Sequence, residues 1–276
     1  MNVERAIIAL GLAVLLAVLP SCGRSEKTGA DGNAAKDLVL DLGNNVTMKL
    51  VLIPAGKFIM GSPAAEKDRW DNEGPQREVT ISKPFYMGVY TVTQEQYRQV
   101  LGVNPSQFGG AQYPVETVSW DDAMEFCKKL SQKTGKTVRL PTEAQWEYAC
   151  RAGSKTRFSY GDDDDYGKLD DYAWYRVDIS VQVAGTTHPV GLKKPNNWSL
   201  YDMHGNVHQW CSDWYADSYA NAVKTDPTGP ASGSSRVLRG GSWYFHPNVC
   251  RSATRFGRNP GSRNYLIGFR VSVEAK

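Results

Sequence analysis

The C-terminal stretch, residues 236–273, reads RVLRGGSWYFHPNVCRSATRFGRNPGSRNYLIGFRVSV. Three blocks in it have the composition of a folded framework: residues 236–243, 250–255 and 267–273. The two segments between them, 244–249 and 256–266, lack helical or strand periodicity and are rich in aromatic residues, Gly, Pro, Asn and Arg. That composition is typical of loops carried by a rigid scaffold. We therefore expect these two loops, and no catalytic centre, to carry the function.

The other end of the chain has the features of an export signal. A short polar start with Arg5 precedes an apolar run over residues 6–19, which is too short to span a bilayer as a helix. The run ends in Leu-Pro-Ser-Cys, which resembles a bacterial lipobox, so we expect a lipoprotein signal peptide at 1–21 and a lipid on Cys22. An export signal without lipidation is the alternative. Residues 22–37 contain almost no large apolar side chain and predict a flexible tether.

Residues 38–276 then form one domain of ordinary size. A net charge of +3 without a basic run after the tether argues against a nucleic-acid partner. Besides Cys22 the chain has Cys127, Cys150, Cys211 and Cys250, whose spacing fits no metal site. Export would permit disulfides among them, but the sequence leaves the pairing open, and buried free thiols are the simplest interpretation.

Local patterns predict short strands and three helices. Alternating residues around Asn44-Asn45 predict a hairpin over 38–51, and further strands are expected at 53–62, 77–81 and 85–92. Helices should begin at the caps Thr93, Ser119 and Thr142, where capping boxes or first-turn acids follow. We expect the acidic run 162–165 to be a solvated turn or, as an alternative that we favour less, a calcium loop. We expect residues 196–214 to lie in the core and residues 217–235 to form a surface loop.

Five strings occur in an order that resembles one known family: IPAGKFIMGS at 53–62, RLPTEAQWEY at 139–148, LYDMHGNV at 200–207, RGGSW at 239–243 and GFR at 268–270. Together they are similar to the formylglycine-generating enzyme, or sulfatase-modifying factor, family over essentially all of residues 38–273. The resemblance implies an α+β protein with a C-type lectin-like fold, which has small antiparallel sheets, two main helices and much irregular structure.

The catalytic members of that family use two cysteines in a C-x₄-C spacing to bind copper(I). Here the first position is Phe245, and Cys250 matches the second by count, although it also fits a structural CRSA string. One thiolate cannot provide the two-sulfur coordination that copper(I) requires, so we do not expect this activity. It remains the alternative function, and a non-catalytic structural protein of the cell envelope is a further one.

Other cofactors are not expected either. Related iron enzymes need a His cluster, but this chain has only His188, His204, His208 and His246. Gly205 and Asn206 argue against a helix that would place His204 and His208 on one face. The string GNVWEW, usual in the family, is GNVHQW here. Gln209 therefore replaces a carboxylate where the family can hold calcium, which argues against calcium. We predict no metal.

The tail is also similar to the variable region of proteins diversified by retroelements, and the whole chain resembles the treponemal variable lipoproteins of that group. In such systems adenines of Asn codons are mutagenised. Glu, Lys, Gln, Met and Trp, which those changes cannot produce, are absent from both loops, whereas three Asn remain. The residues that we expect to contact a ligand are Tyr244, Phe245, His246, Asn248, Val249, Thr254, Phe256, Gly257, Arg258, Gly261, Ser262, Tyr265 and Leu266.

The resulting hypothesis is a lipoprotein, anchored through Cys22 on the outer cell surface, that binds a protein ligand through the variable region 236–273. A mixture of rigid aromatic and adaptable small residues is typical of a binding surface. Ordinary surface loops with gap-filling aromatics are the alternative. If the loops serve binding only, alanine at Tyr244, Phe245, Phe256 and Tyr265 should abolish binding and barely change the melting temperature.

Overall fold

The computed structural model describes residues 37–176 and 185–275. The signal peptide predicted for 1–21 and nearly all of the predicted tether lie outside the described residues. Within the described ranges, no helix is long and apolar enough to cross a membrane.

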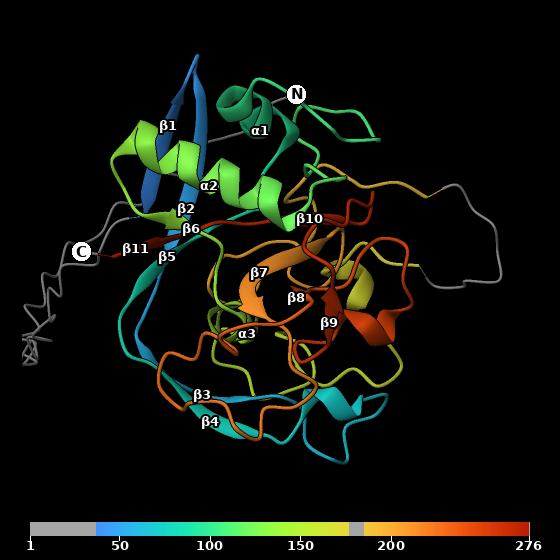
Figure 1. Cartoon of the computed structure of the whole chain (residues 1–276). Coiled ribbons are helices and arrows are strands. Elements are labelled where there is room, and N and C mark those ends of the chain that lie inside the picture. The colour runs from blue at the N-terminus through green and yellow to red at the C-terminus, as the bar shows by residue number, and fades with distance from the viewer. Residues whose placement is uncertain (1–36, 177–184, 276) are drawn as a thin grey trace, which may run out of the picture. The chain divides into compact units, whose positions relative to one another are not determined.

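Two sheets organise the domain (Figure 1). The five-stranded sheet has the order β1-β2-β5-β11-β6 and is antiparallel throughout. The four-stranded sheet has the order β10-β7-β8-β9, in which only the β10–β7 pair is parallel, and β3 pairs with β4 in a separate ribbon. The strands are β1 Leu38–Gly43, β2 Val46–Ile53, β3 Gly56–Met60, β4 Arg77–Ile81, β5 Phe85–Gly88, β6 Val138–Arg139, β7 His208–Trp214, β8 Arg236–Arg239, β9 Arg255–Arg258, β10 Ile267–Phe269 and β11 Ser272–Glu274.

Three α-helices begin after the predicted capping residues: α1 Gln94–Leu101, α2 Trp120–Thr134 and α3 Glu143–Arg151. In each, the side chain of the capping residue, Thr93, Ser119 or Thr142, accepts a hydrogen bond from the third backbone N–H of the helix. The first two helices end at Gly102 and Gly135 with φ of 79° and 66°, a conformation that glycine adopts without strain. Short 3-10 turns, η1 Asp71–Glu73, η2 Leu169–Asp171 and η3 Pro247–Cys250, complete the helical structure.

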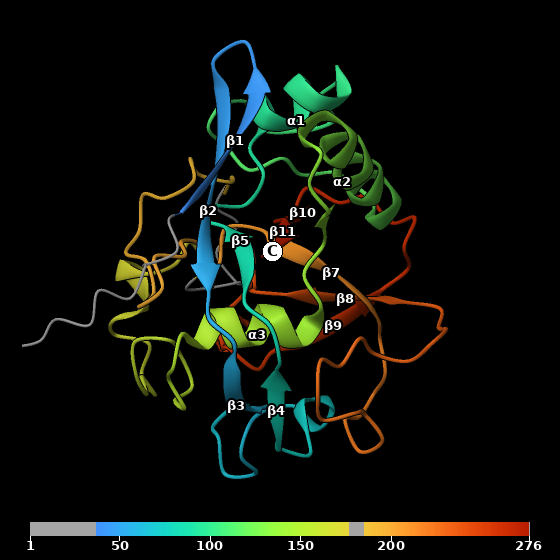
Figure 2. The same ribbon diagram turned by 90° about the vertical axis from the view of Figure 1, so that its left-hand side faces the viewer.

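The helices divide the apolar interior into two main clusters. Helices α1 and α2 pack against β1 and β2, whereas α3 packs against β3, β7 and β8 (Figure 2). The stripe that points inward from α2 consists of Ala123, Phe126, Cys127 and Leu130, which fall at positions i, i+3, i+4 and i+7 of the helix. The four cysteines Cys127, Cys150, Cys211 and Cys250 are buried and free.

The expected class, a mixture of helices with small sheets and long irregular segments, is confirmed, with three helices instead of two main ones. Two boundaries differ. The strand expected at 85–92 ends at Gly88, because the following backbone turns away and the N–H of Val92 bonds to Phe269 outside the ladder. The segment 256–266, expected to be entirely loop, contributes Phe256, Gly257 and Arg258 to β9.

Candidate ligand-binding face

The four-stranded sheet presents two different faces because side chains alternate along a strand. The register pairs Leu238 with both Trp210 and Phe256, and it pairs His208 with Ile267. One face therefore carries His208, Trp210, Leu238, Phe256, Arg258 and Ile267. The other face carries Gln209, Cys211, Val237, Arg239 and Arg255, and it packs towards α3.

Buried ion pairs hold the α3 face. Arg255 donates from Nε and from a terminal nitrogen to the two oxygens of Glu143, at 2.6 and 2.7 Å. Arg239 pairs with Glu143 at 3.2 Å and with Glu147, and it also donates to the backbone oxygen of Thr254 at 2.6 Å. Burial opposes ionisation, but Arg255 and Arg239 outweigh it and hold the pKa of Glu143 below its ordinary value. These contacts fix β8 and β9 to the helix.

Two more arginines of the tail are anchored in the same manner. Arg251 forms ion pairs with Glu73 at 2.5 Å and with Glu66 at 2.7 Å. Arg270 donates from Nε to the side-chain oxygen of Gln209 at 2.6 Å. Four of the five arginines in the framework blocks, Arg239, Arg251, Arg255 and Arg270, are fully buried or nearly so, and the fifth, Arg236, is half-buried. The blocks predicted to be framework are thus tied down individually, between the segments predicted to vary.

The opposite face of the sheet borders a pocket of ≈ 290 Å³. His208, Leu238, Phe256, Arg258 and Ile267 come from the strands, and Gly257 lies between two of them in β9. Loop residues Phe245, Asn264 and Leu266 close its sides. The ring of His208 lies 5.2 Å from that of Phe245 and 5.1 Å from that of Phe256, centroid to centroid.

His208 is a neutral group in this pocket. Burial lowers the pKa of its imidazole to about 3, against the opposing effect of a backbone hydrogen bond with Arg239. The ring nitrogen Nδ1 is buried and has no hydrogen-bond partner among the described residues.

The thirteen residues predicted to contact a ligand fall into three groups. Five are exposed: Tyr244, His246, Gly257, Arg258 and Gly261. Five are half-buried: Phe245, Asn248, Phe256, Ser262 and Tyr265. The last three, Val249, Thr254 and Leu266, are buried.

The structure corrects the placement of these last three residues. The side chains of Val249 and Thr254 lie inside the protein, because η3 and the loop before β9 turn them away from solvent. Leu266 is 8 % exposed, yet it lines the pocket from within. Direct surface contact by Val249 and Thr254 is therefore not supported.

The half-buried aromatic residues belong partly to the core. Phe256 packs edge-on against Trp70, with ring centroids 4.9 Å apart, and Tyr265 packs edge-on against Phe108, with ring centroids 6.0 Å apart. Phe245, Phe256 and Tyr265 all border the larger apolar cluster. Alanine at these three positions should therefore lower the melting temperature as well as weaken binding, since such truncations remove packing as well as surface.

Sequence reasoning missed several residues of this face. Trp70, Phe108 and Arg176 come from distant segments, and the guanidinium of Arg176 lies 5.0 Å from the centre of the Tyr244 ring. Nothing local in the sequence links them to the tail. Only His208 has a local signal in the sequence, the departure of GNVHQW from the usual GNVWEW, and that departure bears on metal binding without indicating a pocket.

The residues present do not fit a copper pair. Phe245 has no donor atom, and its ring packs on the side of the pocket. The thiol of Cys250 lies in a different apolar cluster, with Phe158 and Leu169, where burial raises its pKa above the ordinary value. Among the described residues, no group of three His, Cys, Asp or Glu side chains is arranged to hold a metal.

The positions considered for calcium and for a His site serve hydrogen bonds. The side-chain oxygen of Gln209 accepts from Trp146 at 2.7 Å as well as from Arg270. His204 lies between Ser159 and the backbone oxygen of Cys250, with both distances 2.8 Å, and burial lowers its pKa to about 4. In the acidic run, Asp163 accepts from Tyr160, and Asp164 pairs with Arg157. This run forms part of a hydrogen-bonded turn.

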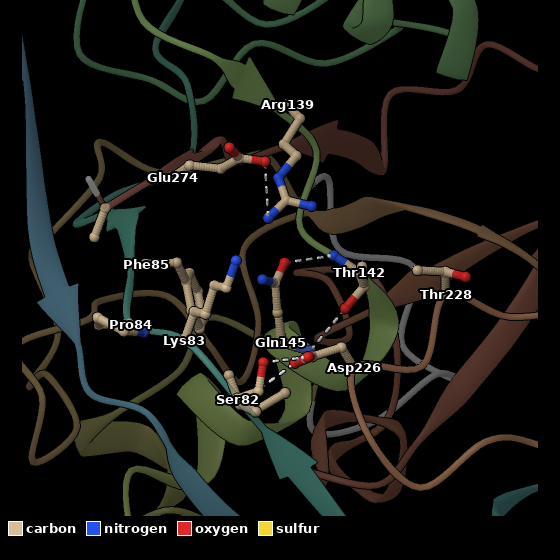
Figure 3. A pocket seen from close by; sticks show the side chains of 12 residues that line it. Ser82, Lys83, Pro84, Phe85, Arg139, Thr142, Gln145, Asp226, Thr228 and Glu274 are labelled. Atoms are coloured by element: carbon tan, nitrogen blue, oxygen red, sulfur yellow. Dashed lines mark hydrogen bonds and ion pairs between the residues drawn. The ribbon is translucent and has the colours of Figure 1, made fainter.

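A second pocket, of ≈ 290 Å³, lies beside the C-terminal strand β11. Figure 3 shows Lys83, Gln145 and Arg139 converging on it. Most of its polar groups bond to one another: Arg139 lies 3.9 Å from Glu274, Ser82 bonds to Asp226, and the backbone of Thr142 donates to Gln145 at 3.1 Å. None of the residues predicted to bind a ligand contributes to it.

Comparisons with known proteins agree with the expected family. Residues 39–275 match the model of the sulfatase-modifying factor enzyme 1-like domain. The formylglycine-generating enzyme of Mus musculus is 28% identical over 339 aligned residues, which cover 95% of this chain and 88% of that protein. The enzyme of Streptomyces coelicolor is 37% identical over 189 residues, which cover 65% of this chain and 58% of that protein.

Two solved structures are similar over nearly their whole length. Treponema denticola variable protein 1 superposes with a TM-score of 0.78 at 31% identity, covering 87% of this chain and 99% of that one. PvdO from Pseudomonas aeruginosa gives a TM-score of 0.76 at 32% identity, covering 86% and 98%. These neighbours confirm the C-type lectin-like fold of the formylglycine-generating enzyme type. The chain belongs to the family of the sulfatase-modifying factor enzyme 1-like domain.

Proposed function

We propose that the protein is an exported lipoprotein, anchored through Cys22, that binds a protein ligand at the outer cell surface. The binding surface is the ligand face, which we define as the pocket bordered by His208 and Phe256 together with the exposed residues Tyr244, His246, Arg258 and Gly261. We further propose that a diversity-generating retroelement varies this surface.

One observation carries this proposal: the tail alternates between anchored and unanchored residues. The arginines at 239, 251, 255 and 270 have buried carboxylate, amide or backbone partners. The segments between them place ten of the thirteen candidate side chains at or near the surface. Substitution at those ten positions leaves the buried ion pairs intact. The likeness to a protein named as variable, at 31% identity, supports the same proposal.

The genomic locus tests the diversification directly. We expect a near copy of the coding segment for residues 236–273 beside a reverse transcriptase gene, with differences confined to adenines of the copy. A locus without such a copy, or a copy that differs equally at all four bases, would contradict this part of the proposal. Independent clones should differ at exposed positions and agree at the four arginines.

Binding is tested with exposed residues, because their truncation spares the core. A protein captured by the wild type should be lost by the triple variant Tyr244→Ala, His246→Ala, Arg258→Ala. It should be retained by Glu78→Ala, which alters an exposed residue of β4 outside the ligand face. Equal capture by both variants would show that the ligand binds elsewhere.

The oxidase function predicts a different result. Copper(I) added with a cysteine-containing sulfatase peptide should give no turnover if the ligand face only binds. Turnover that disappears in Cys250→Ser would overturn the binding proposal.

Mass spectrometry of the N-terminal peptide tests the lipid anchor. Acylation is expected on Cys22 and should be absent in Cys22→Ser.

A further inference from the structure

We propose that the pocket beside β11 is a second ligand site, which binds a carboxylate through Lys83 and Gln145, with Arg139 at its edge. The site shares no residue with the pocket of the ligand face. None of the residues that line it lies in the segments 244–249 and 256–266, so the site stays constant while the loops vary. The inference goes beyond the proposed function and does not depend on it.

The side chain of Gln145 presents one unused donor to this pocket. Its oxygen accepts from the backbone N–H of Thr142 at 3.1 Å, as part of the capping box of α3. Because a backbone N–H requires an acceptor, this bond fixes the orientation of the amide and turns Nε2 toward the pocket (Figure 3). Nε2 has no hydrogen-bond partner among the described residues and, unlike Nε of Arg139, it is not enclosed by protein atoms. A residue that is only 9 % exposed thus offers a donor that a ligand can reach.

Two positive charges accompany this amide. Figure 3 shows the ammonium of Lys83 and the amide nitrogen of Gln145 pointing into the same space, with the guanidinium of Arg139 above them. Lys83 forms no ion pair or hydrogen bond with the described residues, and the ion pair of Arg139 with Glu274, at 3.9 Å, is longer than a hydrogen bond. The N-terminus of α3 adds the positive end of its dipole at the same place. All of these groups favour an anion.

Two carboxylates of the lining limit the charge of that anion. Asp226 is occupied by Ser82, which donates to one oxygen from its backbone N–H at 2.9 Å and to the other from its hydroxyl. Glu274 is exposed and lies nearest to Arg139. The positive and negative side chains of the lining are therefore equal in number, which disfavours a dianion such as phosphate. A single carboxylate matches the ammonium and the amide, because charge-assisted hydrogen bonds to it need no further cation.

Benzoate and benzamide test the site in the whole protein, since they have one shape and differ in charge. Pro84 and Ala275 line the pocket beside the donors and offer apolar surface to the ring. In calorimetric titration we expect wild-type protein to bind benzoate about tenfold more tightly than benzamide, and also more tightly than inorganic phosphate. Equal affinities for benzoate and benzamide, or tighter binding of phosphate, would overturn the assignment.

A peptide distinguishes two sources of the carboxylate. Acetyl-Ala-Phe carries a free C-terminal carboxylate, and its C-terminal amide is the matched control. Tighter binding of this peptide than of benzoate, lost in the amide, would assign the site to a peptide terminus. Weaker binding of the peptide than of benzoate would assign it to a small free acid.

Gln145→Glu separates ligand binding from the structural role of this residue. Glutamate at this position of a capping box keeps the bond to Thr142 but replaces the amide donor with a second acceptor. The affinity for benzoate should fall by about tenfold, while circular dichroism still shows a folded protein. Lys83→Gln should weaken binding by about threefold. The control Lys57→Gln changes an exposed lysine of β3 outside the pocket and should have no effect.

A measurement on the wild type keeps a folding defect of Gln145→Glu from deciding the matter. In ¹⁵N-labelled protein, benzoate should shift the assigned side-chain NH₂ resonances of Gln145 until they saturate. Those of Gln112, an exposed residue outside the pocket, should not move. The absence of a saturable shift at Gln145, or equal affinity for benzoate in the wild type and in a folded Gln145→Glu variant, would overturn the site.

Discussion

At the scale of single residues, the ligand face depends on carboxylates that lie beneath it. Glu143 receives Arg239, Arg255 and the hydroxyl of Tyr219, the last at 3.0 Å. Removing one member of such a network leaves the others charged and unpaired in the interior, which costs about 3–5 kcal/mol. The network keeps two strands in place while the side chains above them change.

Glu143→Gln should therefore lower the free energy of unfolding by about 3–5 kcal/mol, measured by urea denaturation. The matched control is Glu78→Gln, because Glu78 forms its ion pair with Lys57 at 3.0 Å while both side chains are more than half exposed. Exposed pairs contribute about 0–1 kcal/mol. Similar losses in the two variants would mean that the buried network does not anchor the sheet.

Asp213 gives the protein a distinct pH dependence. Burial, and then repulsion from Glu143, raise the pKa of this carboxyl from its ordinary 3.8 to about 7. Between pH 3.8 and about pH 7, the Asp213 carboxyl is ionised in the unfolded chain and protonated in the folded protein. The stabilising contribution is therefore complete below about pH 4 and disappears as the pH rises through 7.

Asp213→Asn lacks this charge, so the variant should gain stability relative to wild type between pH 4 and pH 8. The full change is on the order of 4 kcal/mol for a shift of about three units. Urea unfolding of both proteins at several pH values measures it. Ionisation of His204 and His208 affects both proteins alike and cancels in the difference. A difference that stays constant with pH would refute the assignment.

At the scale of elements, β9 shows that the two variable segments are not equally free. Gly257 lies in this strand, and a Cβ added there would come 2.8 Å from the ring of Tyr215. At Gly261, in the loop, the nearest atom would be a side-chain oxygen of Asn259 at 3.4 Å. Both glycines were predicted to vary, but only the second has room for any side chain without a shift of its neighbours.

Gly257→Ser should accordingly lower stability by about 1–3 kcal/mol, the range for inserting atoms into a packed site. Gly261→Ser should change it by less than about 0.5 kcal/mol. Thermal melts of the two variants, followed by circular dichroism, make the comparison. Equal melting temperatures would indicate that Tyr215 moves aside readily and that β9 accepts diversification as the loop does.

The elements also show what the sequence could predict. The capping residues Thr93, Ser119 and Thr142 place the starts of α1, α2 and α3 correctly, because a helix cap is a local interaction within four residues. β9 was missed, because Arg255-Phe256-Gly257-Arg258 becomes a strand only through pairing with β8. The buried arginines were missed for the same reason, because their carboxylate or amide partners lie 61 or more residues away in the chain. His208 was missed because the rings that it contacts, Phe245 and Phe256, belong to other segments.

At the scale of the whole domain, the chain enters far from the ligand face. Leu38, the first residue of β1, pairs with Leu50 in the five-stranded sheet, whereas the pocket borders the four-stranded one. Figure 1 shows β1, β2 and β11 on one side and β9 on the other. Attachment of the proposed lipid-anchored tether before β1 therefore does not require the ligand face to lie against the membrane.

Thiol labelling on intact cells tests this arrangement. Because Cys127, Cys150, Cys211 and Cys250 are all buried, the wild-type domain should react little with a membrane-impermeant maleimide. Gly261→Cys places one thiol at an exposed position where a side chain fits without a close contact to backbone. We expect this variant to be labelled on intact cells to the same extent as after permeabilisation. Labelling that requires permeabilisation would mean that the ligand face is not displayed on the surface, and it would remove the proposed role in binding external proteins.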